Sequence, residues 1–343
     1  KINIAIVGCG RIAGHHCRAI VKSEKTNLIA VCDLEKEKAD KYAKKYNVNS
    51  YIDYRQMLEE EKQIDTVAII TPSGMHYAHS EEIIKHYKKN IVIEKPTFLK
   101  TSHFQKIEDL ATANNLKIFP VFQNRHNLAV KRVKEALSND ELGTINLVSV
   151  RVRWCRPQKY YDLAPWRGTF SMDGGCLTNQ GIHHLDLMRY LGGEIKKVYS
   201  TMRTFGAEIE VEDSVVGTVQ YENGSIGTLE VTTSARPDDF EASISLVGSK
   251  GLAQIGGIAV NELQTFTPNP KHCNSFSEDF SGCVYGNGHY LIYDEISNDI
   301  NNICSFSVTN KDALKTVQLL NAFYRSHEEQ KTIELTDSKF VDS

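Results

Sequence analysis

The chain has 343 residues, of which 40 are Lys or Arg and 43 are Asp or Glu, giving a formal net charge of −3. This length predicts two domains, because one domain usually has about 100–200 residues. The near balance of charge argues against a nucleic-acid-binding protein that depends on a basic face. No apolar stretch approaches the roughly 18–20 residues that cross a bilayer, and no signal sequence precedes the first strand pattern. We therefore expect neither a membrane protein nor a secreted one.

Eight cysteines are scattered along the chain, and no two of them form a C-x-x-C pair. Zinc and redox motifs are therefore not expected. Scattered thiols of this kind fit a reducing compartment, so we expect a cytoplasmic protein. The cysteines are Cys9, Cys17, Cys32, Cys155, Cys176, Cys273, Cys283 and Cys304.

The first third of the chain alternates short apolar runs with helical stretches, which is typical of βαβ units and a parallel sheet. The runs lack polar alternation, as expected for strands that are covered on both faces. We predict an α/β Rossmann domain with a doubly wound sheet over residues 1–122. The expected strands are Ile2–Val7, Leu28–Cys32, Thr66–Ile70, Ile91–Glu94 and Lys117–Phe122. The expected helices are Ala13–Ser23, Glu35–Tyr46, His79–Lys88 and His103–Asn114.

Residues 123–343 show a different hydrophobic pattern, which predicts strands with alternating polar and apolar residues and few helices. This pattern predicts an α+β domain with a large, mostly antiparallel sheet that is packed on one face only. A turn at 222–225 joins two of the strands as a hairpin. The expected helices are Ala129–Leu137 and Lys311–His327, and the expected strands are Asn146–Trp154, Val198–Phe205, Ser214–Tyr221, Ser225–Thr233 and Ala242–Val247.

A G-x-G-x-x-A motif at residues 8–13 follows the first strand and opens a helix. Gly8 permits a tight turn, Gly10 lets the backbone approach a pyrophosphate, and the helix N-terminus faces the anion. Asp33 ends the second strand 23 residues beyond Gly10, at the usual spacing for the carboxylate that binds the ribose hydroxyls. Because that carboxylate repels a 2′-phosphate, the pattern predicts NAD rather than NADP. The alternative is a structural glycine turn with Asp33 capping a helix.

Lys95 lies in Glu94-Lys95-Pro96, at the end of a predicted parallel strand. Ligands of doubly wound sheets bind at the carboxyl ends of the strands, so the amine should point into a crevice. There it would hydrogen-bond a substrate hydroxyl and stabilise the developing alkoxide. Pro96 restricts the backbone of Lys95. A surface lysine before a proline turn is the alternative.

A third segment, 174–186, carries Asn179, His183 and Asp186 after two glycines. If these residues form one helix, Asn179 and His183 lie at i and i+4 on the same face, and Asp186 lies close enough to orient the imidazole. Histidine is the side chain that handles protons near pH 7, and a hydride transfer from an alcohol also requires loss of a proton. A metal site and a merely structural helix are the alternatives. No third-ligand motif accompanies the histidines, so we expect no metal.

Four segments in this order carry a resemblance: G-C-G-R-I-A at 8–13, T-P-S-G-M-H at 71–76, E-K-P at 94–96 and G-G-x3-N-Q-G-I-H-x2-D at 174–186. Over essentially its whole length the chain resembles the Gfo/Idh/MocA oxidoreductase family. This resemblance implies an open-faced sheet that packs against another subunit, as a homo-tetramer or homo-dimer. It implies that Lys95 and His183 are the catalytic pair. The dinucleotide site that it implies comprises Gly8, Gly10, Arg11, Ile12, Asp33, Thr71, Pro72, His76, Glu94, Lys95, Gln123, Trp166 and Arg167.

An Asp often stands four residues before the catalytic His of this family, whereas this chain has Asn179. An amide cannot act as a base, which leaves proton transfer on His183. Within the family, the segments 121–125, 165–168, 179–183 and 284–289 are similar to enzymes that act on UDP-N-acetylglucosaminuronic acid. Enzymes of that kind oxidise the sugar C3 hydroxyl to a ketone, towards the diacetamido uronic acids of surface polysaccharides such as lipopolysaccharide O-antigen. Some re-oxidise a bound cofactor with 2-oxoglutarate, which makes 2-oxoglutarate a candidate partner.

A nucleotide-diphosphate uronate carries about three negative charges and needs cationic donors and an aromatic surface. The stretch 151–167 offers both, although Arg151 and Arg153 alternate on a strand and fit a solvated face equally well. The candidate substrate contacts are Lys95, Arg156, Tyr161, Asn179, His183, Tyr285 and His289.

These placements predict that His183 accepts the hydroxyl proton while Lys95 stabilises the oxyanion. Other chemistries on the same fold remain open, namely inositol dehydrogenation, reduction of a keto-sugar and NAD-dependent glycoside cleavage. A non-catalytic NAD-binding regulator is the other class, and the occurrence of Lys95 and His183 together argues against it.

Overall fold

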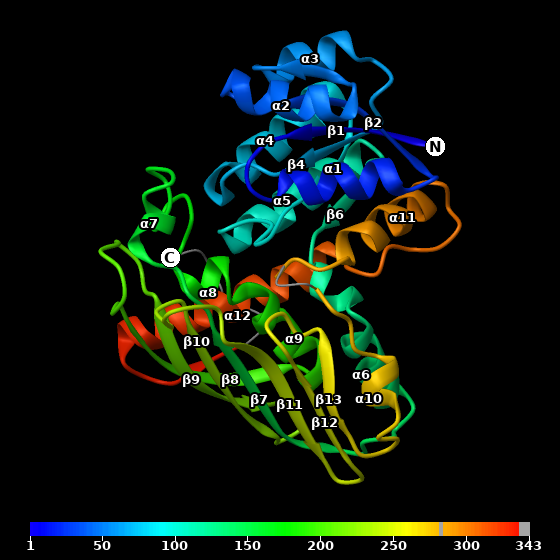
Figure 1. Cartoon of the computed structure of the whole chain (residues 1–343). Helices are drawn as coiled ribbons and strands as arrows, with labels where there is room; N and C mark the ends of the chain where they lie inside the picture. Colours follow the sequence, from blue (N-terminus) through cyan, green and yellow to red (C-terminus); the bar gives the residue numbers. More distant parts are fainter. Residues whose placement is uncertain (281–283, 336–343) are drawn as a thin grey trace. The chain divides into compact units, whose positions relative to one another are not determined.

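The computed structural model describes residues 1–280 and 284–335, so Cys283 lies outside the described residues. The chain divides into two compact units (Figure 1). The first comprises Lys1–Phe122 and Gly288–Leu314, and the second comprises the described residues of Gln123–Asn287 and of 315–335. The segment 288–314 was predicted to belong to the second domain but is part of the first unit. Among the described residues, no helix is both long and apolar enough to span a membrane.

The first unit is built on a parallel sheet of six strands in the order β3-β2-β1-β4-β5-β6. The central strands are mostly apolar, and every residue of β4 is buried, as expected for a sheet with helices on both faces. The strand order reverses between β1 and β4, which is where doubly wound sheets bind ligands at the carboxyl ends of their strands. The strands are β1 (Ile2–Val7), β2 (Thr26–Cys32), β3 (Asn49–Tyr51), β4 (Thr66–Ile69), β5 (Asn90–Ile93) and β6 (Ile118–Pro120).

The helices of the first unit include one from the returning segment, α11 (Gly288–Ile300), which packs against α1 (Ala13–Lys22). The helix expected over His79–Lys88 begins earlier, after a 3-10 turn, and ends in a π-helical turn, Ile83–Tyr87. Asp53 caps α3 by accepting the backbone N–H of Arg55 at 2.9 Å. The other helical elements are α2 (Lys36–Tyr46), α3 (Tyr54–Glu60), the 3-10 turn Ser73–Met75, α4 (His76–Glu82) and α5 (Thr101–Ala113).

The second unit is built on an eight-stranded sheet in the order β13-β12-β11-β7-β10-β9-β8-β14. Its strands pair antiparallel except for β7 and β10, which are parallel neighbours. The mostly antiparallel sheet predicted from the alternating pattern is therefore confirmed. The strands are β7 (Ile145–Arg153), β8 (Ile195–Arg203), β9 (Ser214–Tyr221), β10 (Ile226–Thr232), β11 (Glu241–Gly248), β12 (Leu252–Gly256), β13 (Glu262–Phe266) and β14 (Ile333–Glu334).

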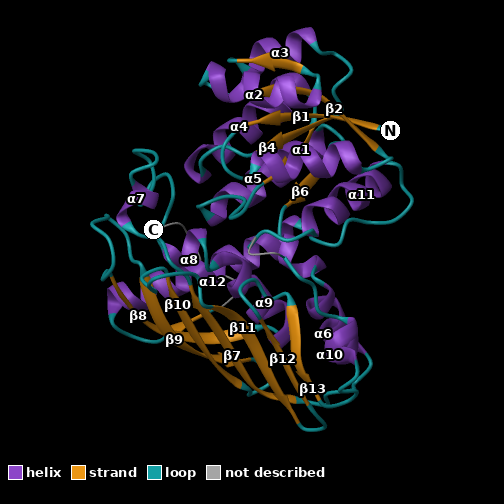
Figure 2. Cartoon of the chain, viewed as in Figure 1, coloured by secondary structure: helices purple, strands orange, loops and turns teal. Residues whose placement is uncertain are grey.

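Side chains of this second sheet alternate between buried and exposed positions, most regularly along β9. Helices pack on the buried side, where the missing side chain of Gly217 leaves room for the ring of Phe323 from α12. Figure 2 shows α8, α9 and α12 on the same side of the sheet. On the other side Tyr199, Val216 and Ile226 are exposed. The helices of this unit are α6 (Leu128–Ser138), α7 (Gln158–Tyr161), α8 (Cys176–Asn179), α9 (Ile182–Gly192), α10 (His272–Ser275) and, from Lys315 onward, α12 (Asn310–Glu329), after a 3-10 turn, Gln123–His126.

Candidate active site

The glycine loop joins β1 to α1 and has the local geometry of a dinucleotide-binding turn. Gly8 has a φ of +105°, and a β-carbon there would lie 2.5 Å from the carbonyl oxygen of Ile70, so only glycine fits. Apart from its chain neighbours, no atom of the described residues lies within 4 Å of the place that a β-carbon on Gly10 would take, which leaves the backbone open to close approach. No acidic side chain lies in the first turn of α1, so the positive end of this helix is not neutralised locally. These features fit an anionic pyrophosphate.

Asp33 follows β2 and holds the loop with its carboxylate. Its Oδ2 accepts the backbone N–H of Cys9 at 2.7 Å, and its Oδ1 accepts the N–H of Glu35 at 2.9 Å. Each carboxylate oxygen can accept a second hydrogen bond, so both remain able to bind a ribose hydroxyl. The helix-capping alternative is wrong, because the N-cap of the following helix α2 is Glu35 and not Asp33.

Thr71 follows β4, and His76 begins α4. The imidazole of His76 is buried, with Nε2 at 2.9 Å from the carbonyl oxygen of Thr71 and Nδ1 at 3.0 Å from that of Thr97. Burial lowers the pKa of His76, which keeps the ring neutral and able to donate to one of these carbonyls at a time. Both ring nitrogens therefore face the protein backbone, so the predicted cofactor contact would have to come from elsewhere in this residue.

Glu94 and Lys95 follow β5. Glu94 is only 6% exposed, and its carboxylate binds three protein groups: His16 at 2.9 Å, His289 at 3.4 Å and the backbone N–H of Lys95 at 3.0 Å. The sequence predicts Glu94 as a residue lining the dinucleotide site. In the structure, the partners of its buried carboxylate are these three protein groups. Lys95 is half-buried, and the peptide bond between Lys95 and Pro96 is cis.

In the second unit, two glycines precede α8, and each position requires glycine for a different structural reason. Gly174 has a φ of +73°, and a β-carbon on Gly175 would lie 1.8 Å from Oε2 of Glu212. Glu212 in turn accepts the backbone N–H of Leu177 at 3.0 Å and the hydroxyl of Tyr324 at 2.9 Å. Glu212 therefore fastens the segment that leads to Asn179, a role that the sequence alone did not reveal. Burial raises the pKa of this carboxyl to about 7.

The expectation of one helix carrying both Asn179 and His183 is wrong. Asn179 ends α8 and His183 is the second residue of α9, because the chain makes a wider turn at Gly181, whose N–H donates to the carbonyl of Cys176 five residues back. The amide of Asn179 donates to the buried carboxylate of Asp173. His183 is 7% exposed.

Asp186 was expected to orient the ring of His183, but the structure shows other partners. Its carboxylate accepts two hydrogen bonds from Arg125, both at 2.7 Å, and one from the hydroxyl of Thr316 at 2.8 Å. A bidentate pair of this kind is a strong, geometrically specific interaction. Asp186 thus ties α9 to the 3-10 turn Gln123–His126 and to α12.

Arg156 was predicted as a substrate contact and Arg167 as a cofactor contact, and the two arginines differ in their surroundings. Arg156 donates to Asp239 at 2.8 Å, so its charge is balanced within the second unit. Arg167 has no ion pair among the described residues; its guanidinium lies 4.7 Å from the ring centre of Trp166 and donates to the hydroxyl of Tyr160 at 2.8 Å. Of these two, Arg167 is the one whose charge is left for a ligand.

Other candidates in the second unit lie on the sheet or beside it. Arg153 pairs with Glu230 and Glu241, and Arg151 approaches Glu241 at 3.7 Å, which fits the solvated-face alternative for both arginines. The hydroxyl of the buried Tyr161 bonds that of Thr233 at 3.2 Å.

The remaining candidates fall in different units. Gln123 is buried and Tyr285 is half-buried, and both belong to the second unit. His289 is 2% exposed and belongs to the first unit, where it contacts Glu94. Its contact with substrate stays a prediction.

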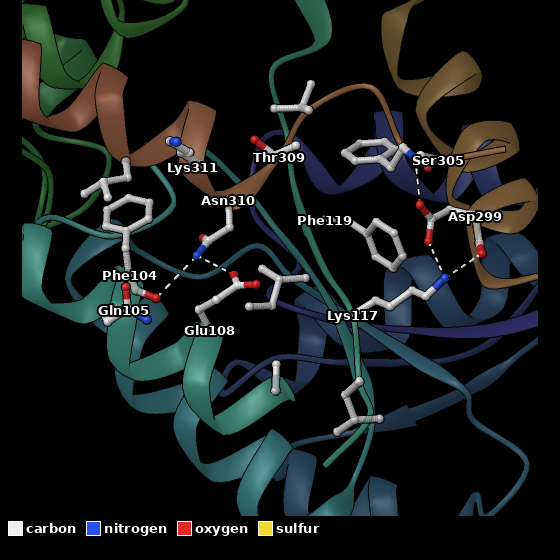
Figure 3. A pocket seen from close by; sticks show the side chains of 16 residues that line it. Phe104, Gln105, Glu108, Lys117, Phe119, Asp299, Ser305, Thr309, Asn310 and Lys311 are labelled. Carbon is white, nitrogen blue, oxygen red and sulfur yellow. Dashed lines mark hydrogen bonds and ion pairs between the residues drawn. The ribbon is translucent and has the colours of Figure 1, made fainter. Parts of the chain in front are cut away.

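A cavity of about 660 Å³ lies in the first unit between α5, β6 and the segment that leads from α11 into α12 (Figure 3). Lys117 reaches Asp299 across it at 2.6 Å, and Asn310 donates to Glu108 at 2.8 Å. None of the predicted site residues lines this cavity, so it is not the dinucleotide site.

The chain is similar to known proteins in family, sequence and structure. Residues 2–122 match the oxidoreductase family with an NAD-binding Rossmann fold, and residues 130–254 match the GFO/IDH/MocA C-terminal domain. The WlbA dehydrogenase from Bordetella pertussis, solved with NADH and UDP-GlcNAcA, is 32% identical over 98% of both chains, with a TM-score of 0.92. The chain belongs to the Gfo/Idh/MocA oxidoreductase family. It is therefore an NAD-dependent oxidoreductase, as the glycine loop and Asp33 predict.

Two further members of the Gfo/Idh/MocA family illustrate its range. The WlbA dehydrogenase from Chromobacterium violaceum, also solved with NADH and UDP-GlcNAcA, is 31% identical over 98% of this chain and 97% of its own, with a TM-score of 0.89. The D-glucoside 3-dehydrogenase of Escherichia coli is 27% identical over 67% of this chain and 70% of its own length.

Proposed function

We propose that this oxidoreductase converts the C3 hydroxyl of UDP-N-acetyl-D-glucosaminuronic acid to a ketone, with NAD as the hydride acceptor. The observation that carries the proposal is the similarity, over nearly the whole chain, to two dehydrogenases that were solved with NADH and UDP-GlcNAcA. The reaction removes a hydride from C3 and a proton from its hydroxyl, so the sugar becomes two mass units lighter.

The residues of the first unit that would hold the dinucleotide are those of the glycine loop and Asp33. The open backbone at Gly10 and the unneutralised end of α1 suit the pyrophosphate, and the Asp33 carboxylate suits the ribose hydroxyls. Bound NAD supplies a nicotinamide ring that takes up the hydride. Arg11, Ile12, Thr71 and Pro72 complete the proposed cofactor contacts in this unit, and Gln123, Trp166 and Arg167 those in the second.

Lys95 and His183 are proposed as the catalytic pair. His183 takes the hydroxyl proton, since a neutral imidazole is the side chain suited to this near pH 7. The Lys95 ammonium hydrogen-bonds the same oxygen and stabilises the negative charge that develops on it. Asn179 can orient the substrate but cannot take a proton, because an amide has no basic site at neutral pH.

Several contacts beyond this pair are proposed with it. Arg167 offers the substrate or the cofactor a positive charge that no described carboxylate balances. The exposed side of the second sheet is the proposed surface for a homo-dimer or homo-tetramer. We also propose that the enzyme acts in the cytoplasm, in the formation of surface-polysaccharide sugars. 2-Oxoglutarate is the proposed oxidant of the NADH that forms.

The similarity to D-glucoside 3-dehydrogenase favours a second candidate, oxidation at C3 of a sugar without a nucleotide. Incubation of the protein with each sugar, with and without NAD and 2-oxoglutarate, followed by mass spectrometry, separates the two. We expect a ketone two mass units lighter from the UDP uronate, and none from the free glucoside. A ketone from the free glucoside alone would instead support oxidation of a free sugar. The absence of product from both sugars would refute both candidates.

A further inference from the structure

Four buried side chains form a cluster directly beside Lys95 within the first unit. His16 of α1, Glu94 after β5, and His289 and Tyr293 of α11 are all at most 6% exposed. One nitrogen of each imidazole and one carboxylate oxygen lie within 4.8 Å of one another. The cluster therefore joins the helix after the glycine loop, the turn that carries Lys95 and the returning segment 288–314.

The hydrogen bonds of this cluster have a definite direction. Burial alone would raise the pKa of Glu94, but the hydrogen bonds from His16 and His289 outweigh it and hold the pKa well below its ordinary value. An ionised carboxylate only accepts, so Nε2 of both imidazoles carries a hydrogen. Burial lowers the pKa of His16, which leaves its Nδ1 free of hydrogen to accept from the Tyr293 hydroxyl at 2.7 Å.

The other carboxylate oxygen of Glu94 accepts the backbone N–H of Lys95 at 3.0 Å. We propose that Glu94 is a positioning residue for Lys95, whose backbone it fixes through a carboxylate that is itself held by His16 and His289. The proposal rests on the proposed catalytic role of Lys95 for its effect on turnover. Its structural part, the fixing of the Lys95 backbone, does not depend on that role.

The rest of the turn supports this proposal. The backbone N–H of Glu94 donates to the carbonyl of Ile69 at 3.1 Å, and that of Thr97 donates to the carbonyl of Glu94 at 3.0 Å. Thr97 is a β-branched residue with a φ of +74°, a conformation that persists only where its surroundings enforce it. Nδ1 of His76 lies 3.0 Å from the Thr97 carbonyl oxygen. Backbone strain held by neighbouring contacts is typical of sites where a side chain must be placed accurately.

A metal ion is the other reading of two histidines and a carboxylate, and the geometry disfavours it. A metal-bound histidine nearly always donates its second ring N–H to an acceptor. Nδ1 of His289 is buried and has no hydrogen-bond partner among the described residues. If Nε2 bound a metal, the proton would have to move to this nitrogen and remain unpaired there. With Nε2–H donating to Glu94, Nδ1 carries only a lone pair, which costs less to bury.

The variant Glu94→Gln tests the proposal because a glutamine cannot replace this carboxylate. Its single oxygen accepts at most two of the three hydrogen bonds, and its amide presents a donor to the third partner. The matched control is Glu61→Gln, a buried carboxylate of the same unit that accepts from Asn49 at 2.5 Å and from Tyr51 at 2.9 Å.

Two readouts separate positioning from general stability. In Glu94→Gln we expect hydrogen exchange of the Lys95 amide to accelerate by tenfold or more, while Glu61→Gln leaves it unchanged. We also expect kcat to fall by about 10- to 100-fold, with NADH affinity and KM within about threefold, because a displaced catalytic group loses rate rather than binding. Unchanged exchange at Lys95 would overturn the proposal. Faster exchange with unchanged turnover would instead refute the catalytic role of Lys95.

A milder pair of variants keeps the test valid if Glu94→Gln does not fold. His289→Leu removes one donor to Glu94 and should reproduce part of the faster exchange at Lys95. His289→Gln supplies an amide donor and should return the exchange rate towards that of the parent protein. Equal exchange in the two variants would contradict the proposal. So would stoichiometric zinc in the purified protein with a loss of folding in EDTA, which would establish the metal site instead.

Discussion

The carboxylate of Asp33 accepts the backbone N–H of Cys9 at 2.7 Å, which ties the end of β2 to the glycine loop after β1. The residue that we propose to bind the cofactor's ribose is thus hydrogen-bonded to the loop that we propose to bind its pyrophosphate. Substitution of Asp33 should therefore affect both the affinity for the dinucleotide and the choice between NAD and NADP.

The variant Asp33→Asn should bind NADH about 10- to 100-fold more weakly, the range expected for loss of a charge-assisted hydrogen bond. The ratio of NADPH to NADH affinity should rise, because the charge that repels a 2′-phosphate is gone. Fluorescence titration with both cofactors measures this. Asp53→Asn is the matched control, since Asp53 also accepts the N–H two residues on but caps α3. An unchanged affinity ratio in Asp33→Asn would contradict the assignment.

Gly8 and Gly10 should respond differently to alanine. Gly8→Ala forces a left-handed φ and a clash with the Ile70 carbonyl, so we expect the melting temperature to fall by roughly 5–10 °C. The added methyl group of Gly10→Ala meets no described atom within 4 Å beyond its chain neighbours, so folding should be kept while NADH binding weakens by at least about tenfold. Calorimetry and NADH titration on both variants distinguish the two effects. If Gly10→Ala bound NADH normally, the backbone at Gly10 would not be the surface that the pyrophosphate approaches.

Glu212 makes a testable contribution to the pH dependence of stability. Burial raises its pKa from 4.5 to about 7, so the folded state holds a proton between these values that the unfolded state has released. The free energy of unfolding should fall as pH rises through this window, by about 3 kcal/mol in total, and level off above it. In Glu212→Gln this decline should disappear from denaturant titrations between pH 5 and pH 8. A variant with the same slope as the parent would show that Glu212 does not titrate there.

The exposed side of the second sheet should be needed for assembly. Val216 is 60% exposed on β9 and lies opposite Glu230 on β10, so Val216→Lys introduces a charge that the strand pair itself tolerates. We expect it to shift the mass measured by light scattering to that of a monomer. Val21→Lys, on α1 and 53% exposed, should leave the mass unchanged. An oligomer that persists in Val216→Lys would exclude this part of the sheet as the interface.

The first unit was largely predictable because its signals are local. The strand Ile2–Val7, the glycine loop and Asp33 lie within one βαβ unit, where the apolar run, the turn and the strand end follow one another in the chain. The second sheet was recognisable for a similar reason. Alternation along Ser214–Tyr221 reports directly that one face of the strand is buried.

Features that depend on distant partners were not predictable from one sequence. Glu94 meets His16 and His289, which lie 78 and 195 residues away in the chain, and nothing local distinguishes it from a solvated carboxylate. Glu212 likewise reaches Leu177 from 35 residues away. The segment 288–314 shows no local sign that it returns to the first unit. Gly181 widens the turn between α8 and α9 through a single backbone hydrogen bond, which side-chain periodicity does not report.

Lys95 and His183 are expected to be needed for chemistry but not for cofactor binding. Lys95→Ala and His183→Ala should each lower kcat by about a hundredfold or more, as for loss of a positioned acid–base group. Titration with NADH should give affinities close to that of the parent protein. Lys100→Ala, an exposed lysine five residues along, is the control and should keep full activity. Parent-like turnover in either variant would remove that residue from the mechanism.

Transfer of deuterium from C3 of the sugar tests the central claim most directly. The protein would be given UDP-N-acetylglucosaminuronate deuterated at C3 together with NAD, and sugar and cofactor would be analysed by mass spectrometry. We predict a keto-sugar that has lost the deuterium and a reduced cofactor one mass unit heavier; with 2-oxoglutarate present, the label should pass on to 2-hydroxyglutarate. A sugar that keeps its deuterium, from protein shown to bind NAD, would contradict oxidation at C3.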